Sequence, residues 1–558
     1  MDFIKIYLFC FLTCYCIFSY GHAINKVLFK FKINSIAELI ILGFIFLSFL
    51  ALFLNFFISL NVYLNTFIFF ISFIFLFISK NSIDFINVTK KIAIISLIGF
   101  VTFLLDHSNR PDAGLYHLPY ISMLNEEKII LGSVNLHFRF GHISSLQYLY
   151  AIFNNLILSD NGILIPLTLI FPTISIYFYE ELKINHNITL KLFSIFSLVF
   201  ILSTMNRYSG FGNDDPAHMI YLLSTYNIMK LFIIKNEDPK KIYNKIVLYC
   251  INTFLIKQFY VLILVFPLIV FIANFKKINL FTKPNIFSTF FILLWLFKNI
   301  LISSCVLYPV NLTCIKSLEW SPIGTISDSK KVSLSSEAWA KAYPDRINKS
   351  KGYREHISDY EWIKGWMNTH SKVVIKKILP LLIFSILIIL FCYATLEYRK
   401  KVKTKKIILI IFVINLIFLL FWFFKFPTYR YGAAYLGTSI ILSSIIILNR
   451  FNIKHNIRKI FTYTLILLCF LLTLKNFNRI FKNLDTKYID YPWPKKNSFT
   501  SSNKKNTNIP RIQDKEIIYY TASPYTLCMY SKAPCTSFKN LKLKRIIYPW
   551  NYKVLIAN

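Results

Sequence analysis

The segment between positions 106 and 142 concentrates residues that can do chemistry in a chain otherwise poor in polar groups. It holds four acids, four histidines and three basic residues within 37 positions, which is more than a connection between two helices needs. Carboxylates and imidazoles are the side chains that most often move protons in active sites. We therefore take Asp112, His117 and His137 as candidate catalytic residues. The simpler alternatives are that Asp112 caps a helix and that Glu126 and Glu127 form a solvated face.

A second polar group follows at Asn213-Asp214-Asp215-Pro-Ala-His218. Two adjacent carboxylates can bind a divalent cation such as Mg²⁺ or Mn²⁺, or can hold an acceptor substrate. The proline that follows is typical of a helix start, so the alternative is that one of the two acids serves as an N-cap. Asp214 and Asp215 are thus the candidate metal or acceptor ligands.

Three basic residues are candidate ligands for a phosphate group. Arg430 lies in the sequence Lys425-Phe-Pro-Thr-Tyr-Arg-Tyr-Gly432, where a guanidinium near a helix start favours a phosphate. Arg139 belongs to the first polar group, and Lys257 sits between two apolar stretches. Snorkelling of Lys257 toward water explains its position equally well.

Four of the ten cysteines lie in two short local pairs, Cys305 with Cys314 and Cys528 with Cys535. Such spacing, without histidine partners, predicts two local disulfides and an oxidising compartment. The other six cysteines fall within apolar stretches, where small-residue packing is their expected role.

The elements that must position these residues are membrane helices. Of the 558 residues 56% are hydrophobic and only 16% are charged. Apolar stretches of about 17 to 25 residues recur, and each can cross a hydrocarbon core of ~30 Å. This excludes a disordered chain, a secreted disulfide scaffold and a cytosolic enzyme. The net charge of +37 lies in short Lys and Arg runs between the stretches, so we expect no nucleic-acid partner.

We predict about fourteen transmembrane helices, near 4–21, 37–59, 62–79, 90–106, 160–179, 189–205, 216–235, 244–256, 258–274, 286–306, 373–395, 406–425, 433–449 and 457–474. If the basic loops face the cytoplasm, both termini lie outside. Counting 142–158 as a span would invert the later loops, so we expect a juxtamembrane or re-entrant helix there. The weak pair 244–256 and 258–274 must be two short helices with Lys257 at their outer turn.

Three regions follow from this topology. Residues 1–89 form an N-terminal extension of three spans, and residues 90–474 form the transmembrane core with outer loops 107–159, 206–215 and 307–372. Residues 475–558 form a small α/β or mostly β extracytoplasmic domain, with a strand at Glu516-Ile-Ile-Tyr-Tyr-Thr521. Ile121, Leu124 and Ile129 predict a short helix lying on the membrane surface beside Asp112.

The two acidic groups on one outer face resemble the GT-C glycosyltransferases, multi-span enzymes that use polyprenyl-phosphate- or diphosphate-linked sugars. Asp112 matches the essential acid of their first long outer loop, and Asp214 and Asp215 match a second acidic motif. In this chain three spans precede the motif loop, whereas GT-C enzymes usually place it after the first.

The sequence also resembles a family of bacterial integral membrane proteins. The resemblance is carried by Asp112-Ala-Gly-Leu-Tyr-His-Leu-Pro, Leu124-Asn-Glu-Glu, Gly132-Ser-Val-Asn-Leu-His-Phe-Arg-Phe-Gly-His-Ile-Ser-Ser145, Leu307-Tyr-Pro-Val, Leu318-Glu-Trp320, Ala338-Trp-Ala, Arg430-Tyr-Gly432 and Cys528 to Cys535.

These resemblances imply a glycosyltransferase of the bacterial inner membrane with an extracytoplasmic site. Asp112 would be the general base, with His117 and His137 nearby. The donor would be a polyprenyl-linked sugar, and the acceptor an envelope glycan, lipid or protein. Two rivals stay open: a surface-polysaccharide polymerase or ligase acting through Arg346 and Arg354, and a lipid or sugar transporter, which would need polar residues at midplane depth.

Overall fold

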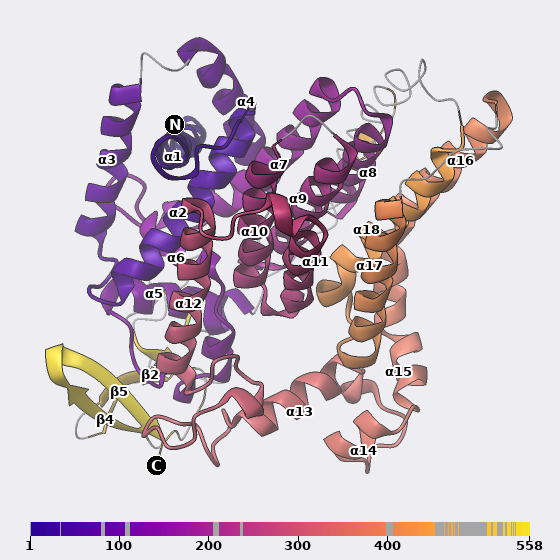
Figure 1. Ribbon diagram of the computed structural model, residues 1–558. Coiled ribbons are helices and arrows are strands. Elements are labelled where there is room, and N and C mark those ends of the chain that lie inside the picture. The colour runs from indigo at the N-terminus through magenta and orange to yellow at the C-terminus, as the bar shows by residue number, and fades with distance from the viewer. Residues whose placement is uncertain are drawn as a thin grey trace.

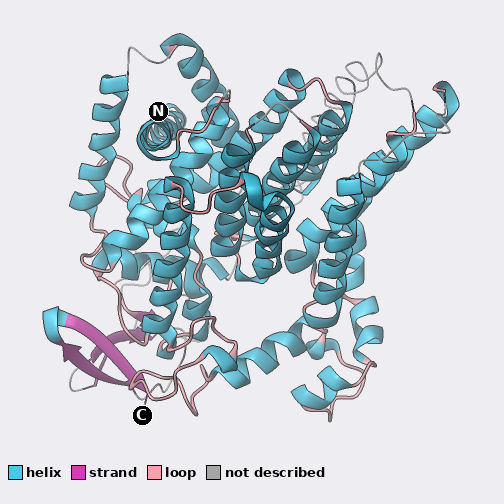
Figure 2. Cartoon of the chain, in the orientation of Figure 1, coloured by secondary structure: helices cyan, strands magenta, loops and turns pink. Residues whose placement is uncertain are grey.

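The computed structural model describes residues 2–33, 35–79, 84–105, 112–204, 211–234, 238–397 and 406–451, and, beyond these, single positions from 463 to 478 and segments between 511 and 557. The described chain is mostly helical and ends in strands near the C-terminus, as predicted (Figures 1 and 2). The helices pack side by side, and the strands lie at the lower left of the view, against one end of the bundle.

The long helices of the bundle are α1 (Asp2–Ile24), α2 (Ile36–Asn55), α3 (Val62–Ser79), α4 (Phe85–Leu105), α7 (Ile165–Ile184), α8 (Ile188–Thr204), α9 (Asp214–Ile233), α10 (Pro239–Ile256), α11 (Val265–Asn274) with the 3-10 turn Gln258–Leu264 before it, α12 (Lys283–Ser303), α16 (His370–Thr395), α17 (Lys406–Lys425) and α18 (Tyr429–Leu448). Within the described residues nine helices are long and apolar enough to cross a membrane. The number fourteen stays a prediction, and the last predicted span, 457–474, lies largely outside the described residues.

The break between α10 and the next helix falls where the sequence predicted it. α10 ends at Ile256, and Lys257 has an extended backbone that caps it before a new helix starts at Gln258. Lys257 therefore sits in the turn between two helices at the same end of the bundle as the start of α9.

Two glycines let α1 and α2 pack at backbone distance. A Cβ atom added at Gly21 would lie 1.8 Å from the carbonyl oxygen of Leu39, and one at Gly43 would lie 1.9 Å from that of Ile17. Small residues at crossing points are typical of helices that pack within membranes, where close backbone contact replaces the hydrophobic drive.

The polar segment 112–159 folds into short helices packed inside the protein. A π-turn (Ala113–His117) leads into α5 (Leu118–Glu126), and α6 spans Ser145–Ile152. α6 has eight residues and is too short to cross, in agreement with the expected topology. The expected surface helix is wrong in its setting: residues 118–125 of α5 are all buried, because neighbouring segments cover every side of the helix.

The segment 307–372 carries α13 (Ser329–Ala340), α14 (Tyr353–Ser358) and α15 (Trp362–Asn368), and it begins at a disulfide between Cys305 and Cys314. These helices lie at the lower right in Figure 1, below α16 to α18.

The C-terminal strands form two small sheets. β1 (Arg511–Asp514) pairs antiparallel with β2 (Ile517–Thr521), which pairs parallel with β3 (Cys535–Thr536). β4 (Leu543–Tyr548) and β5 (Tyr552–Ala557) make an antiparallel hairpin, with Tyr548 opposite Tyr552. β2 coincides with the predicted strand, and Cys528 is disulfide-bonded to Cys535.

The strands do not stand apart as a separate body, because they pack on the segment 112–159. The N–H of Leu131 donates to the carbonyl of Lys553 at 3.0 Å, and the N–H of Leu555 donates back to Leu131 at 2.9 Å. The Asn135 side chain donates to the Leu555 carbonyl at 2.9 Å. The last strand of the chain is thus hydrogen-bonded to the first polar segment.

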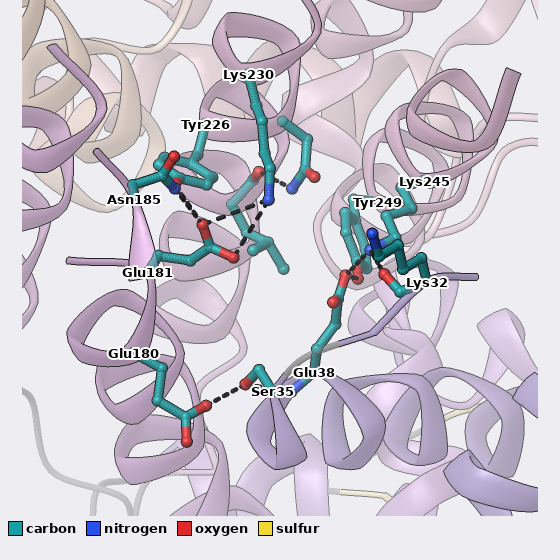
Figure 3. Close-up of polar contacts among 12 residues, drawn as sticks. Lys32, Ser35, Glu38, Glu180, Glu181, Asn185, Tyr226, Lys230, Lys245 and Tyr249 are labelled. Carbon is teal, nitrogen blue, oxygen red and sulfur yellow. Dashed lines mark hydrogen bonds and ion pairs between the residues drawn. The ribbon is translucent and has the colours of Figure 1, made fainter. Parts of the chain in front are cut away.

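Three glutamates are buried at the other end of the helices, where α7 and α9 finish and α2 begins (Figure 3). Glu38 accepts from Lys245 at 2.7 Å and from the Tyr249 hydroxyl at 3.0 Å. We call this region, which holds Glu38, Glu180 and Glu181, the glutamate end.

The two adjacent glutamates of α7 are paired as well. Glu180 pairs with Lys91 and with the Ser35 hydroxyl. Glu181 lies 3.4 Å from Lys230 and accepts from the Asn185 amide at 2.6 Å and from the Tyr226 hydroxyl. Every buried acid of the glutamate end is therefore matched by a cation.

Candidate functional site

A cavity of about 320 Å³ opens where α9 and α18 begin, at the end of the bundle opposite the three glutamates. Its lining comes from five parts of the chain: Asp112 and His117 before α5; Gly212, Asp214, Asp215 and His218 at the start of α9; Trp339 of α13; His370, Val373 and Lys377 of α16; and Thr428, Tyr429 and Arg430 at the start of α18. Asp112, His117, Asp214, Asp215 and Arg430 were all predicted as site residues, and the fold brings them together. We call this the Asp112 cavity.

Asp214 is held between two cations. Lys257 Nζ lies 2.6 Å from its Oδ1, and Arg430 Nε lies 3.3 Å from its Oδ2. Burial by itself would raise the pKa of Asp214, but Arg430 and Lys257 outweigh it and hold the pKa well below its usual value. Asp214 therefore stays ionised and serves as the counter-ion of the two cations.

Arg430 keeps hydrogen-bonding capacity after this pairing. It meets Asp214 through Nε, and within the described chain its two terminal amino groups have no hydrogen-bond or ion-pair partner. The terminal nitrogens of a guanidinium are the pair that binds phosphate or carboxylate oxygens bidentately. Arg430 can thus hold an anion in the cavity while Asp214 fixes its position.

The capping box at the start of α6, formed by Ser144 and Gln147, determines which ring nitrogen of His117 carries the proton. Gln147 Oε1 accepts from the Ser144 N–H at 2.7 Å, so Gln147 Nε2 faces His117 Nδ1, also at 2.7 Å. An amide NH₂ can only donate, so Nδ1 accepts and Nε2 carries the ring proton. Burial lowers the pKa of His117 to about 3, so this ring is a neutral hydrogen-bond donor near neutral pH.

His218 is a cavity residue that was not among the predicted site residues. Its Nε2 lies 3.1 Å from the Arg430 carbonyl oxygen, and its Nδ1 lies 3.6 Å from Asp215 Oδ1. A carbonyl can only accept, so Nε2 carries a proton and ties α9 to the start of α18. The signal that could have found it is the i, i+3 spacing of Asp215 and His218 on one helix face.

Asp112 presents an open carboxylate to the cavity. It stands at the N-cap of the turn Ala113–His117, yet its side chain makes no capping hydrogen bond. Within the described residues no ion pair or hydrogen bond holds this carboxylate. The capping alternative therefore fails, and Asp112 is available to accept a proton.

The far wall of the cavity consists of residues that sequence reasoning missed. Trp339 and His370 pack with ring centroids 5.7 Å apart, and Lys377 follows two turns along α16 from His370. No local pattern marks these residues, because the wall forms only when the segment 307–372 folds back over the start of α9.

Three predicted site residues lie outside the cavity lining: Lys257, which still contacts Asp214, and two residues of the first polar group. His137 is buried in an aromatic cluster, stacked 4.7 Å from Phe538, and its Nδ1 accepts from the Arg139 N–H at 3.1 Å. The guanidinium of Arg139 lies 5.0 Å from the Phe138 ring centroid. In the structure His137 packs in the core and caps its own turn, and Arg139 covers aromatic rings, so the roles assigned to both stay predictions.

The described residues do not fit a divalent metal at Asp214 and Asp215. Among them no group of three or more His, Cys, Asp or Glu side chains is arranged to hold an ion. Asp214 is already neutralised by Lys257 and Arg430, and Asp215 faces His218. A metal ion would have to displace these cations, so we derive no chemistry through one.

The two arginines of the polymerase or ligase alternative also lie outside the Asp112 cavity. Arg346 donates to the carbonyls of Tyr343 at 3.1 Å and Lys349 at 2.7 Å, and its guanidinium lies 3.9 Å from the Tyr343 ring centroid. It therefore staples its own loop. Arg354 is exposed at the start of α14 and does not line the Asp112 cavity.

Comparison with known proteins adds one family. No curated protein and no solved structure matches the chain. Residues 3–437 match a family described as a domain of unknown function, DUF8201. The match covers every residue that lines the Asp112 cavity, whereas the C-terminal strands lie beyond it. The chain is therefore a member of the DUF8201 family.

Proposed function

We propose that the protein is an integral-membrane glycosyltransferase that moves a sugar from a polyprenyl-phosphate-linked donor to a hydroxyl of an envelope acceptor. The observation that carries this proposal is the meeting of Asp112, Asp214 and Arg430 in one cavity at the end of an apolar helix bundle. An open carboxylate beside a cation is the pair that transfer from a phosphate leaving group needs.

The proposed reaction forms one bond and breaks one. The acceptor oxygen bonds to the anomeric carbon, and the bond from that carbon to the phosphate oxygen breaks. The proton of the acceptor hydroxyl goes to the Asp112 carboxylate, and the bonding electron pair stays on the leaving phosphate. The terminal nitrogens of Arg430 hold the phosphate of the donor, and the neutral His117 donates a hydrogen bond through Nε2.

Asp214 has a supporting role in this proposal. Its ion pairs with Lys257 and Arg430 hold it as an anion, so it is a poor proton acceptor at neutral pH. It positions the guanidinium through Nε. Its negative charge also offsets the repulsion between the two cations. Asp112 is thus the base, and Asp214 a positioning residue.

The membrane setting explains the donor. We place the Asp112 cavity on the outer face of a bacterial inner membrane, with both termini on that side, because basic loops are retained in the cytoplasm. Nucleotide sugars are not present outside, so a transferase there must use a sugar that has crossed on a lipid carrier.

Replacing the base tests the proposal. In proteoliposomes supplied with a polyprenyl-phosphate-linked sugar, Asp112→Asn should lower the transfer rate at least about a hundredfold. Asp345→Asn is the matched control, because Asp345 is an exposed acid of the segment 307–372 outside the cavity. An undiminished rate in Asp112→Asn would remove the base from the proposal, and sugar transport without bond formation would favour a transporter.

A further inference from the structure

The tip of the β4–β5 hairpin carries an unusually exposed tryptophan. Trp550 is 87% exposed and sits in the three-residue turn Pro549–Asn551 between the strands. In Figure 2 this turn lies at the far left end of the hairpin. A large aromatic ring left in water at a loop tip forgoes the hydrophobic gain that contact with an apolar surface would give.

The backbone of the tip adds a second observation. Trp550 has φ +58° and ψ +27°, and Asn551 has φ +58°. Asparagine tolerates this left-handed region, but a bulky residue seldom occupies it. Two consecutive left-handed residues are typical of tight hairpin turns, and here the first of them is a bulky tryptophan.

The tip lies where a predicted span ends. The Tyr552 hydroxyl donates to the carbonyl of Phe56 at 2.6 Å, one residue after α2 finishes at Asn55. α2 is one of the nine helices long and apolar enough to cross a membrane within the described chain. Trp550 is therefore close to the level at which the bilayer meets water.

The surface beside the tip has the composition of a membrane interface. Phe57 is 59% exposed and Tyr63 is 77% exposed, at the end of α2 and the start of α3. Lys128 donates to the Trp550 carbonyl, and its ammonium lies 4.0 Å from the Tyr552 ring centroid. Tryptophan, tyrosine and lysine gather at headgroup depth because each has an apolar body and a polar end.

We propose that the β4–β5 tip inserts Trp550 into the lipid headgroup layer at the Asp112 end of the bundle and anchors the C-terminal strands to the bilayer. The occupant of this surface is lipid, because Tyr552 beside the tip contacts the end of α2, where Phe57 is exposed. The anchor is independent of the proposed transferase activity. The anchored strand β5 is hydrogen-bonded to Leu131, which belongs to the same segment as Asp112.

Spin labelling at the tip tests this anchor. The labels are placed on Trp550→Cys and, as a matched control, on Lys544→Cys in lipid nanodiscs. Lys544 is exposed on β4, four residues before Tyr548, roughly 13 Å along the strand. Labelling of the unsubstituted protein gives the background, and the five free cysteines of the described chain are buried.

Collisions with oxygen and with a water-soluble nickel chelate report the depth of each label. The ratio of oxygen to nickel accessibility should be at least about threefold higher at position 550 than at position 544, because oxygen concentrates in the lipid. Equal ratios would place the tip in water and overturn the proposal. A label at 550 shielded from both reagents would show that protein covers it, which also overturns it.

A second measurement avoids any cysteine substitution. Fluorescence of the unsubstituted protein minus that of Trp550→Phe reports Trp550 alone. Lipids brominated near the headgroup should quench this difference signal by at least about half, since quenching requires contact. No quenching of the difference signal would contradict the anchor even if the labelled variants failed to fold.

Discussion

The two ends of α9 hold buried acid–base pairs in contrasting settings. Asp214 starts the helix and Lys230 lies sixteen residues later, roughly 24 Å along the axis. At the glutamate end, Glu181 is satisfied by Lys230, Tyr226 and Asn185, as Figure 3 shows. At the Asp112 cavity, Asp112 faces an open space, and the terminal nitrogens of Arg430 have no partner within the described residues.

The two ends differ in the hydrogen-bonding capacity of their charged groups. At the glutamate end this capacity is filled within the protein, and at the Asp112 cavity part of it is left for a ligand. A buried ion pair whose remaining hydrogen bonds are all filled can only serve the structure, because no capacity is left for a substrate. An open carboxylate beside an unfilled guanidinium has that capacity. The comparison predicts loss of stability at one end and loss of activity at the other.

The largest expected effect on stability is at the glutamate end. Glu181→Gln removes the charge that faces Lys230 and should lower the free energy of unfolding by about 3 kcal/mol. Thermal unfolding in detergent measures it. Glu361→Gln is the control, because Glu361 pairs with Lys351 at a half-exposed site where the loss should be below about 1 kcal/mol. Equal shifts for both variants would break the comparison.

The disulfide near the cavity should have the next largest effect. Replacing Cys528 and Cys535 by serine opens a loop whose Met529 N–H donates to the Gly114 carbonyl at 3.0 Å. Closing a loop of this size contributes about 2–3 kcal/mol, so limited proteolysis should release the C-terminal strands first. Unchanged protection of these strands would show that their other contacts suffice.

At the cavity, Arg430→Lys separates charge from hydrogen-bonding geometry. The lysine keeps a positive charge near Asp214 but lacks the paired terminal nitrogens. We expect the KM for the lipid-linked donor to rise about tenfold with a smaller change in kcat. Lys257→Arg, which also keeps its charge, should leave the KM within about twofold. A fall in kcat alone would move Arg430 from donor binding to the chemical step.

A further effect concerns pH. Burial lowers the pKa of His137 to about 3, below the ordinary value near 6.5. Between these two pKa values the unfolded chain binds a proton at His137 and the folded chain does not. The free energy of unfolding therefore decreases as the pH falls from about 6.5 toward 3. His137→Phe should reduce this slope by about 1.4 kcal/mol per pH unit, measured by unfolding between pH 6 and 4. An unchanged slope would mean that His137 is protonated when folded.

Sequence patterns predicted the features of this molecule that depend on residues close together in the chain. Apolar length placed the helices, because a bilayer forces backbone groups to pair within each span. Short cysteine spacing foretold both pairs, and the turn at Lys257 followed from the charge of the flanking loops. The meeting of Asp112 with Asp214 was expected from sidedness alone.

Sequence reasoning failed where distant segments meet. Nothing near Leu131 indicates that the last strand of the chain pairs with it, and nothing in His370 or Lys377 indicates that they close the cavity. The burial of α5 was misread, since its apolar residues fit a membrane surface and a protein core equally well. His137 and Arg139 lie in the right segment but point into packing.

The central claim is that the Asp112 cavity does chemistry while the glutamate end holds the fold. One paired experiment tests it: transfer rate and melting temperature are measured together for Asp112→Asn and Glu181→Gln in proteoliposomes. The account predicts that Asp112→Asn loses at least about a hundredfold in rate and melts within about 2 °C of the unsubstituted protein. Glu181→Gln should melt several degrees lower with its rate at low temperature nearly kept. An Asp112→Asn protein that melts early but transfers sugar at full rate would contradict the account.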